Sequence, residues 1–152
     1  MANTVQLLLA ESVNLASENV LAALLRLPED KRNWSPGGIA RTALDIVAEC
    51  AMNNRYTADL ILTHEWQMND QEAYNRKKAE IAAGSLESLT QLLKENTGYL
   101  VGVIEKVATE DLDVEVYTPY GTGPLSGVMT YPYWNMKYHE GQLNYIDSIL
   151  GN

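Results

Sequence analysis

The sequence predicts an all-α protein in which four amphipathic helices pack as a four-helix bundle, with a short hairpin or ordered loop before the last helix. Apolar residues recur at spacings of three and four along most of the 152 residues, which is the period of an α-helix. Residues 111–130 break this pattern with glycines and two prolines. Packing four helices together is the simplest way to bury every apolar stripe, so we expect a single domain over residues 1–152.

Prolines bound the first two predicted helices. The first ends at Pro28, and the second opens with Ser35 as cap and Pro36 in the first turn. The second helix then continues to about Trp66, a length of roughly 45 Å at about 1.5 Å per residue. The apolar stripes are Val5, Leu8, Leu9, Val13, Ala16, Val20, Ala23, Leu24 and Leu27 in the first helix, and Ile39, Ala43, Ile46, Val47, Cys50, Ala51, Leu60 and Ile61 in the second.

The second half of the chain follows the same habit after a polar, partly helical connection at residues 67–84. Ser85 is placed to cap a third helix, and residues 111–130 combine extended backbone with a turn. Pro132 fits the first turn of the last helix, which Gly151 would end. The third stripe consists of Leu86, Leu89, Leu93, Leu100, Ile104 and Val107.

Composition excludes several classes of partner. Asp and Glu outnumber Lys and Arg by 20 to 11, for a net charge of -9, so we expect binding to neither nucleic acid nor a membrane surface. The single cysteine, Cys50, cannot form an internal disulfide and reads as a buried core residue of a cytoplasmic protein. The apolar run at residues 7–10 is too short for a membrane span, so we expect a soluble, unexported protein.

One face of the last helix predicts where a site would lie. Its members follow steps of four, three, four and four, with polar groups first and apolar groups beyond: Asn135, His139, Gln142, Ile146 and Leu150. The second helix offers Asp45, Glu49 and Asn53, each one turn apart. If both faces point inward, Glu49 and His139 meet at a pocket between helices. His64 lies about four turns beyond Glu49, so we expect it at a helix end or on the surface.

Aromatic residues gather in the same region of the sequence. Rings with a polar edge suit the mouth of a pocket or a protein interface. The alternative is that they only cover the end of the bundle beneath the hairpin. This group consists of Tyr117, Tyr120, Tyr131, Tyr133, Trp134 and Tyr138.

Three segments, taken in order, resemble the DinB-like superfamily: LRLPEDKRNWSP at residues 25–36, ARTALDIVAECA at 40–51 and YHEGQLNYIDSILG at 138–151. The most specific pieces are the Trp-Ser-Pro at residues 34–36 and the His-x-Gly-Gln at residues 139–142. The resemblance implies an up-down-down-up bundle that is often dimeric. In many members it also implies a divalent metal held by one histidine on the second helix and a His-x-x-x-His pair on the last.

Only His139 matches a ligand of that resemblance, as the second histidine of the pair. Asn135 stands where the first would be, and the second-helix ligand falls at Asp45 or Glu49. An amide oxygen is a poor ligand for zinc or nickel, so the usual three-histidine site is absent. A mixed set of His139, Glu49 and Asp45 is the alternative that would still bind zinc, nickel or manganese.

Two hypotheses follow. In the favoured one, the chain is a homodimeric DinB-like bundle without the usual metal site. Its polar residues are then either a structural network around His139 or the lining of a small-molecule pocket, made by Asn135, His139, Gln142, Glu49 and Asn53. The alternative is a metal-dependent thiol transferase or hydrolase, as known among DinB-like proteins, with His139 and Glu49 as candidate catalytic residues.

Overall fold

The computed structural model describes residues 4–151, and these are mostly helical with one small sheet. The predicted helical class, with a hairpin before the last helix, is confirmed. The elements are α1 (Thr4–Arg26), α2 (Ala43–Thr63), α3 (Gln71–Ala83), α4 (Leu86–Ile104), β1 (Glu115–Thr118), β2 (Gly121–Pro124) and α5 (Leu125–Leu150), with 3-10 turns at Glu29–Lys31 and Thr109–Asp111.

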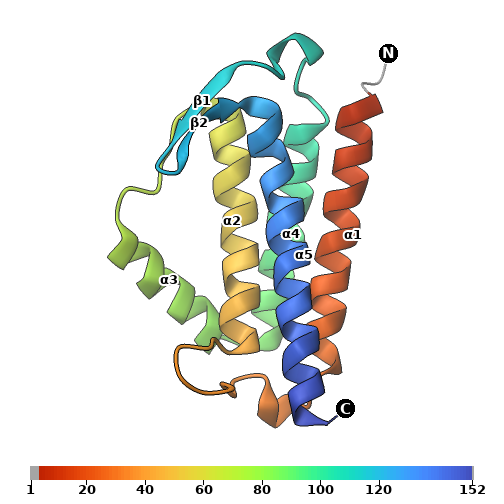
Figure 1. Cartoon of the computed structure of the whole chain (residues 1–152), viewed down its shortest axis with the longest axis vertical. Coiled ribbons are helices and arrows are strands. Elements are labelled where there is room, and N and C mark those ends of the chain that lie inside the picture. The colour runs from red at the N-terminus through yellow and green to blue at the C-terminus, as the bar shows by residue number, and fades with distance from the viewer. Residues whose placement is uncertain (1–3, 152) are drawn as a thin grey trace.

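Four long helices lie side by side, and the shorter α3 lies outside them next to α2 (Figure 1). In this view α1 and α5 run downward, whereas α2 and α4 run upward. Helices α1 and α2 each contact both α4 and α5. The core lies between these helices, and its largest fully buried side chains include Leu24, Leu93, Leu100, Met136 and Leu143.

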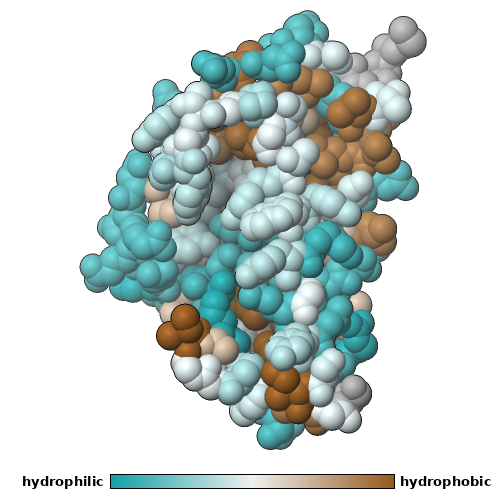
Figure 2. Space-filling model, viewed as in Figure 1, coloured by the Kyte–Doolittle hydropathy of each residue, from teal (hydrophilic) through white to brown (hydrophobic). Residues whose placement is uncertain are grey.

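The buried seam of α1 confirms the predicted stripe from Val13 onward and differs from it in the first two turns. It follows steps of four and three through Gln6, Ala10, Val13 and Ser17, and the Nε2 group of Gln6 donates to the backbone carbonyl of Val107 at 3.0 Å. Leu8 and Val5 fall off this seam and are exposed. Figure 2 shows hydrophobic surface near the upper end of α1.

By length and composition, α1 is apolar enough to cross a membrane, which the expectation from residues 7–10 missed. The helix packs against α4 and α5. It also places Val13, Val20 and Leu24 in the core. These contacts pack one face of α1 into the bundle.

The predicted start of α2 is wrong. The helix begins at Ala43, where the Thr42 hydroxyl accepts a hydrogen bond from the Asp45 amide at 3.2 Å. Residues 35–40 instead form a turn that Ser35 closes, because Gly37 and Gly38 adopt φ values of 116° and 59° that a right-handed helix excludes. Ile39, expected in the core, is consequently fully exposed.

The C-terminal end of α2 partly agrees with the prediction. The helix stops at Thr63, before Trp66, and His64 ends it in the left-handed conformation with φ of 58°. The helix-end position expected for His64 is confirmed. Cys50 is fully buried, as expected.

The next two elements follow their local capping signals. The connection at residues 67–84 contains α3, whose first turn is capped by the Asp70 side chain through the Ala73 amide at 2.9 Å. Ser85 caps α4 as predicted, accepting from the Ser88 amide at 3.0 Å. A side-chain oxygen that accepts from an otherwise unsatisfied amide explains both starts.

The last helix begins earlier than predicted. Strands β1 and β2 pair antiparallel, with Thr118 opposite Gly121, and α5 starts directly after β2. Pro132 therefore lies inside the helix, where it has no N–H to donate to the carbonyl of Val128. Gly151 ends α5 as expected, with φ of 82°.

Candidate functional site

His139 and Glu49 meet between α5 and α2, as the sequence predicts. The Nε2 atom of His139 lies 3.0 Å from Oε1 of Glu49, and its Nδ1 atom lies 2.6 Å from Oε1 of Gln142. His139 is buried, and Glu49 and Gln142 are half-buried. Three of the predicted site residues thus form one hydrogen-bonded chain.

Both ring nitrogens of His139 face oxygen acceptors in this arrangement. A ring that carries protons on both nitrogens satisfies them together. A neutral ring would need the Gln142 amide turned, so that its NH₂ group faces Nδ1. In either form the ring is held at both edges, and its orientation toward Glu49 is set by Gln142.

Two cationic side chains, Arg41 and Lys78, also contact Glu49. Nη1 of Arg41 lies 2.7 Å from Oε2 of Glu49, and Nζ of Lys78 lies 4.0 Å from the same oxygen. The neighbouring Asp45 accepts a hydrogen bond from Nε of Arg41 through Oδ2, and its Oδ1 lies 3.3 Å from Nζ of Lys78. We call these five residues, Arg41, Asp45, Glu49, Lys78 and His139, the ion-pair cluster.

The cluster keeps Glu49 ionised. Burial acts to raise the pKa of this carboxyl group, but it is outweighed by the hydrogen bond from His139 and by the charges of Arg41, His139 and Lys78. The net effect lowers the pKa of Glu49 from 4.5 to about 2. Glu49 is therefore a carboxylate throughout the neutral range.

The other two predicted residues, Asn135 and Asn53, take no part in this chain. Asn135 is buried, its Nδ2 lies 3.5 Å from the Tyr131 hydroxyl, and its Oδ1 has no hydrogen-bond partner among the described residues. Asn53 accepts a hydrogen bond from the Tyr74 hydroxyl at 2.9 Å. Asn135 is thus close to His139 in sequence without bonding to its ring.

The donor set around Glu49 is a poor fit to a divalent metal. The described residues include no group of three His, Cys, Asp or Glu side chains arranged as metal ligands. One Glu49 oxygen already contacts Arg41, and the other contacts His139. A metal at Glu49 would meet the positive charges of Arg41 and Lys78 at close range.

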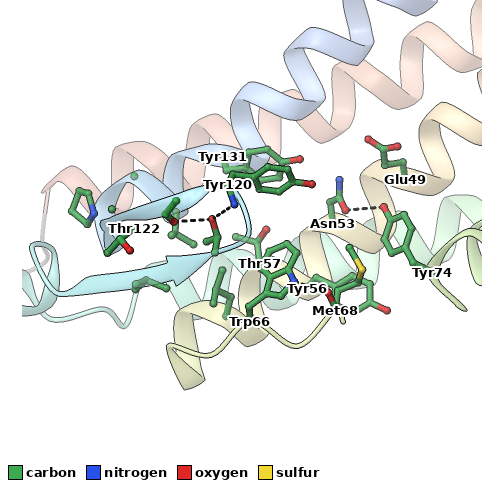
Figure 3. A pocket seen from close by; sticks show the side chains of 18 of the residues that line it. Glu49, Asn53, Tyr56, Thr57, Trp66, Met68, Tyr74, Tyr120, Thr122 and Tyr131 are labelled. Carbon is green, nitrogen blue, oxygen red and sulfur yellow. Dashed lines mark hydrogen bonds between the residues drawn. The ribbon is translucent and has the colours of Figure 1, made fainter. Parts of the chain in front are cut away.

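A pocket of about 520 Å³ opens beside Glu49 (Figure 3). It lies between α2, α3, the hairpin and the first turns of α5, and the space-filling surface is hollowed there (Figure 2). Glu49 and Asn53 are at one end. Five aromatic residues from different parts of the chain form much of its lining: Tyr56, Trp66, Tyr74, Tyr120 and Tyr131.

The lining differs from the predicted one. Asn135, His139 and Gln142 are not among the lining residues, so His139 reaches the pocket only through Glu49. The sequence reading missed Tyr56, Trp66 and Tyr74. A signal existed for the first, because Glu49, Asn53, Tyr56 and Leu60 continue one helical face in steps of four, three and four.

The predicted aromatic group divides between two places. Tyr120 and Tyr131 line the pocket, as one reading expected. Trp134 and Tyr138 continue from Tyr131 along the exposed surface of α5, with ring centroids 5.9 and 5.6 Å apart. These three rings form an aromatic ladder along α5, and of the three only Tyr131 lines the pocket.

The tyrosine hydroxyls near Glu49 stay protonated. Burial and the charge of Glu49 raise the pKa of Tyr131 to about 12, and the same two causes raise the pKa of Tyr74. The Tyr131 phenol therefore offers an O–H donor at the end of the pocket where Glu49 lies, whereas the O–H of Tyr74 donates to Asn53.

Comparison with known proteins rests on structure alone, since no family model and no curated protein matches the sequence. A DinB-like protein (YjoA) from Bacillus subtilis superposes with a TM-score of 0.70 over 95% of this chain and 92% of its own, at 15% identity. The fold is DinB-like. The predicted resemblance is confirmed at this level.

Two other solved structures share the DinB-like fold. A conserved protein from Enterococcus faecalis has a TM-score of 0.74 at 14% identity, covering 96% of each chain. A mycothiol-dependent maleylpyruvate isomerase has a TM-score of 0.76 at 19% identity over 91% of this chain. The chain spans only 59% of the length of that isomerase. Identities this low show the fold and not the activity.

The depressed pKa of Glu49 predicts a specific loss of stability in acid. The unfolded carboxyl group titrates near 4.5 and the folded one near 2, so the stabilisation is complete above pH 4.5 and is lost as the pH falls toward 2. The shift corresponds to at most about 3 kcal/mol. In urea unfolding between pH 7 and pH 3, we expect the stability gap between wild type and Glu49→Gln to narrow below pH 4.5.

The matched control is Glu140→Gln, which removes a carboxylate next to His139 that pairs with Lys137 instead. This variant should keep the wild-type acid dependence attributed to Glu49. A gap between wild type and Glu49→Gln that stays constant with pH would contradict the ion-pair cluster.

Proposed function

We propose that this chain is a small-molecule-binding protein of the DinB-like fold that works without a bound metal. Its pocket is the one beside Glu49, and its four long helices have the up-down-down-up order of DinB-like bundles. The observation that carries the proposal is the engagement of Glu49 by Arg41, Lys78 and His139, which fills the position where a metal would need open oxygens.

The size and lining of the pocket support a ligand role. A volume of about 520 Å³ lies within the range of sites that take drug-sized or metabolite-sized molecules. Aromatic side chains supply apolar area, and Glu49, Asn53 and the tyrosine hydroxyls supply a few convergent polar groups at one end. This combination orients a ligand by hydrogen bonds and holds it by ring contacts.

In this proposal His139 is a positioning residue. It is buried outside the lining, and it fixes the Glu49 carboxylate through Nε2 while Gln142 fixes the ring. Asn135 and Asn53 hold the hydroxyls of Tyr131 and Tyr74, so they act on the ligand through the aromatic wall. The metal-dependent transferase or hydrolase alternative would require a metal to displace Arg41 and Lys78 from Glu49.

We place the protein in the cytoplasm as a homodimer. The exposed ladder of Tyr131, Trp134 and Tyr138 on α5 supports a self-association surface, because exposed aromatic residues are enriched at protein interfaces. Light scattering on the eluting protein tests this expectation. A monomer at every concentration would contradict it.

The metal-free proposal predicts little response to divalent ions. Protein purified without a histidine tag should carry less than about 0.1 metal per chain, and zinc, nickel or manganese should shift its Tm by less than about 1 °C, since only a bound ion stabilises the folded state. Elemental analysis and thermal unfolding check this in wild type and in His139→Ala. Near-stoichiometric metal in wild type that is lost in His139→Ala would establish the metal-dependent alternative.

The pocket proposal predicts that small molecules change the environment of Trp66. Binding of fragments from a chemically mixed library should change tryptophan fluorescence in wild type and in Trp134→Phe, because Trp134 lies outside the lining. The same fragments should give no such change in Trp66→Phe. A library without a single fragment that distinguishes these two variants would overturn the pocket.

A further inference from the structure

We infer that the pocket beside Glu49 binds an organic ammonium ion, meaning an amine or quaternary ammonium group with apolar substituents. This inference rests on the proposed function, that the pocket takes a small molecule, and goes further by stating the charge and chemical class of that molecule. Three independent features of the lining carry it: the aromatic walls, the charge balance and the hydrogen-bond acceptors.

The walls consist of aromatic rings that face one space from several directions (Figure 3). Tyr56 on α2 and Tyr74 on α3 have ring centroids 5.9 Å apart, and Trp66 meets Tyr120 of the hairpin edge-on at 6.2 Å. Tyr131 completes the set from α5. The face of an aromatic ring is electronegative and attracts a cation within about 6 Å of its centroid.

The charge on the pocket lining is negative. Glu49 is the charged residue of the lining, which contains no Lys, Arg or His. Within the ion-pair cluster, the cations Arg41 and Lys78 equal the carboxylates Asp45 and Glu49 in number. Because Glu49 is the member of the cluster that lines the pocket, the negative end of the cluster faces the ligand.

A ligand of the opposite sign would be disfavoured. An anion would meet Glu49 and the ring faces without a lining cation to pair with. A neutral ligand would fill the same volume but would lose the attraction of both the rings and the carboxylate. The net charge of -9 also attracts cations to the protein before they reach the pocket.

The hydrogen-bond acceptors of the lining also favour a ligand that is a hydrogen-bond donor or a cation. Oε1 of Glu49 holds one contact, to His139, and a carboxylate oxygen has room for a second, whereas Oε2 already contacts both Arg41 and Lys78. Val128 also lines the pocket, and its carbonyl lacks the usual N–H donor four residues later, because that residue is Pro132. Both groups suit an ammonium N–H or the polarised methyl groups of a quaternary nitrogen.

The test is a series of three probes with one shape and three charges: choline, 3,3-dimethylbutan-1-ol and 3,3-dimethylbutanoate. Amide and indole N–H signals of the full chain are followed by NMR as each probe is added. We expect choline to bind at least about tenfold more tightly than the alcohol, which is the gain from a desolvated cation at aromatic faces. The butanoate should bind most weakly.

Variants separate the walls from the carboxylate. Tyr120→Leu and Glu49→Gln should each weaken choline binding about fivefold or more while leaving the affinity for the alcohol within about twofold. Tyr145→Leu is the matched control, since Tyr145 is an exposed aromatic residue of α5 that lies outside the lining and has no part in the proposed self-association surface. Tyr120 is 86% exposed, so its replacement does not disturb the core even if Glu49→Gln weakens the fold.

The outcomes distinguish this inference from the proposed function. Equal or tighter binding of the alcohol or the butanoate would overturn the ammonium assignment while leaving the pocket in use. Loss of choline binding in Tyr145→Leu, with no loss in Tyr120→Leu, would overturn it as well. If none of the three probes binds while neutral or acidic fragments still report through Trp66, the ligand class is wrong and the proposed function stands.

Discussion

The structure depends on how the negative charge of one half-buried carboxylate, Glu49, is compensated by its neighbours. Moving an ionised carboxylate out of water costs several kcal/mol unless opposite charges and hydrogen bonds replace the water. Those replacements come from three segments: Arg41 before α2, Lys78 on α3 and His139 on α5. Satisfying one side chain therefore holds three separate segments of the chain at fixed positions.

The contacts that compensate the charge of Glu49 also hold α3 in place, and α3 forms part of the pocket wall. Among the described residues of α3, only Tyr74 is buried. Burial of apolar surface therefore contributes little to the packing of α3 against α2. Lys78 joins it to Asp45 and Glu49, and the Tyr74 hydroxyl joins it to Asn53. The ring of Tyr74 then faces Tyr56 and becomes a wall. The site exists because a polar contact between α2 and α3 places an aromatic residue.

The parts that could be predicted from sequence are those that depend on local chemistry. Caps such as Ser85 and the stop at Gly151 follow from neighbouring backbone groups, and the meeting of Glu49 with His139 follows from helical period. The failures come from conflicts between local rules. Gly37 overrides the Ser-Pro start signal by adopting positive φ, and Pro132 is tolerated inside α5 because the helix already begins at the hairpin.

The partners of Glu49 could not be predicted, because they depend on tertiary structure. Arg41 reaches Glu49 only because α2 begins two residues later, after the glycine turn, and Lys78 reaches it only because α3 folds back along α2. The same return brings Tyr74 to the pocket, which no periodicity of α3 indicates. A helix with a single buried residue carries almost no pattern from which its docking face could be read.

This compensation also constrains the chemistry that Glu49 can perform. A carboxylate with a pKa of about 2 is a weak base, and general-base catalysis is most effective when the pKa lies near the working pH. The groups that lower this pKa, Arg41, Lys78 and His139, already engage both oxygens of the carboxylate. What remains for Glu49 is a permanent, oriented negative charge at the end of an aromatic pocket, which favours binding over proton transfer.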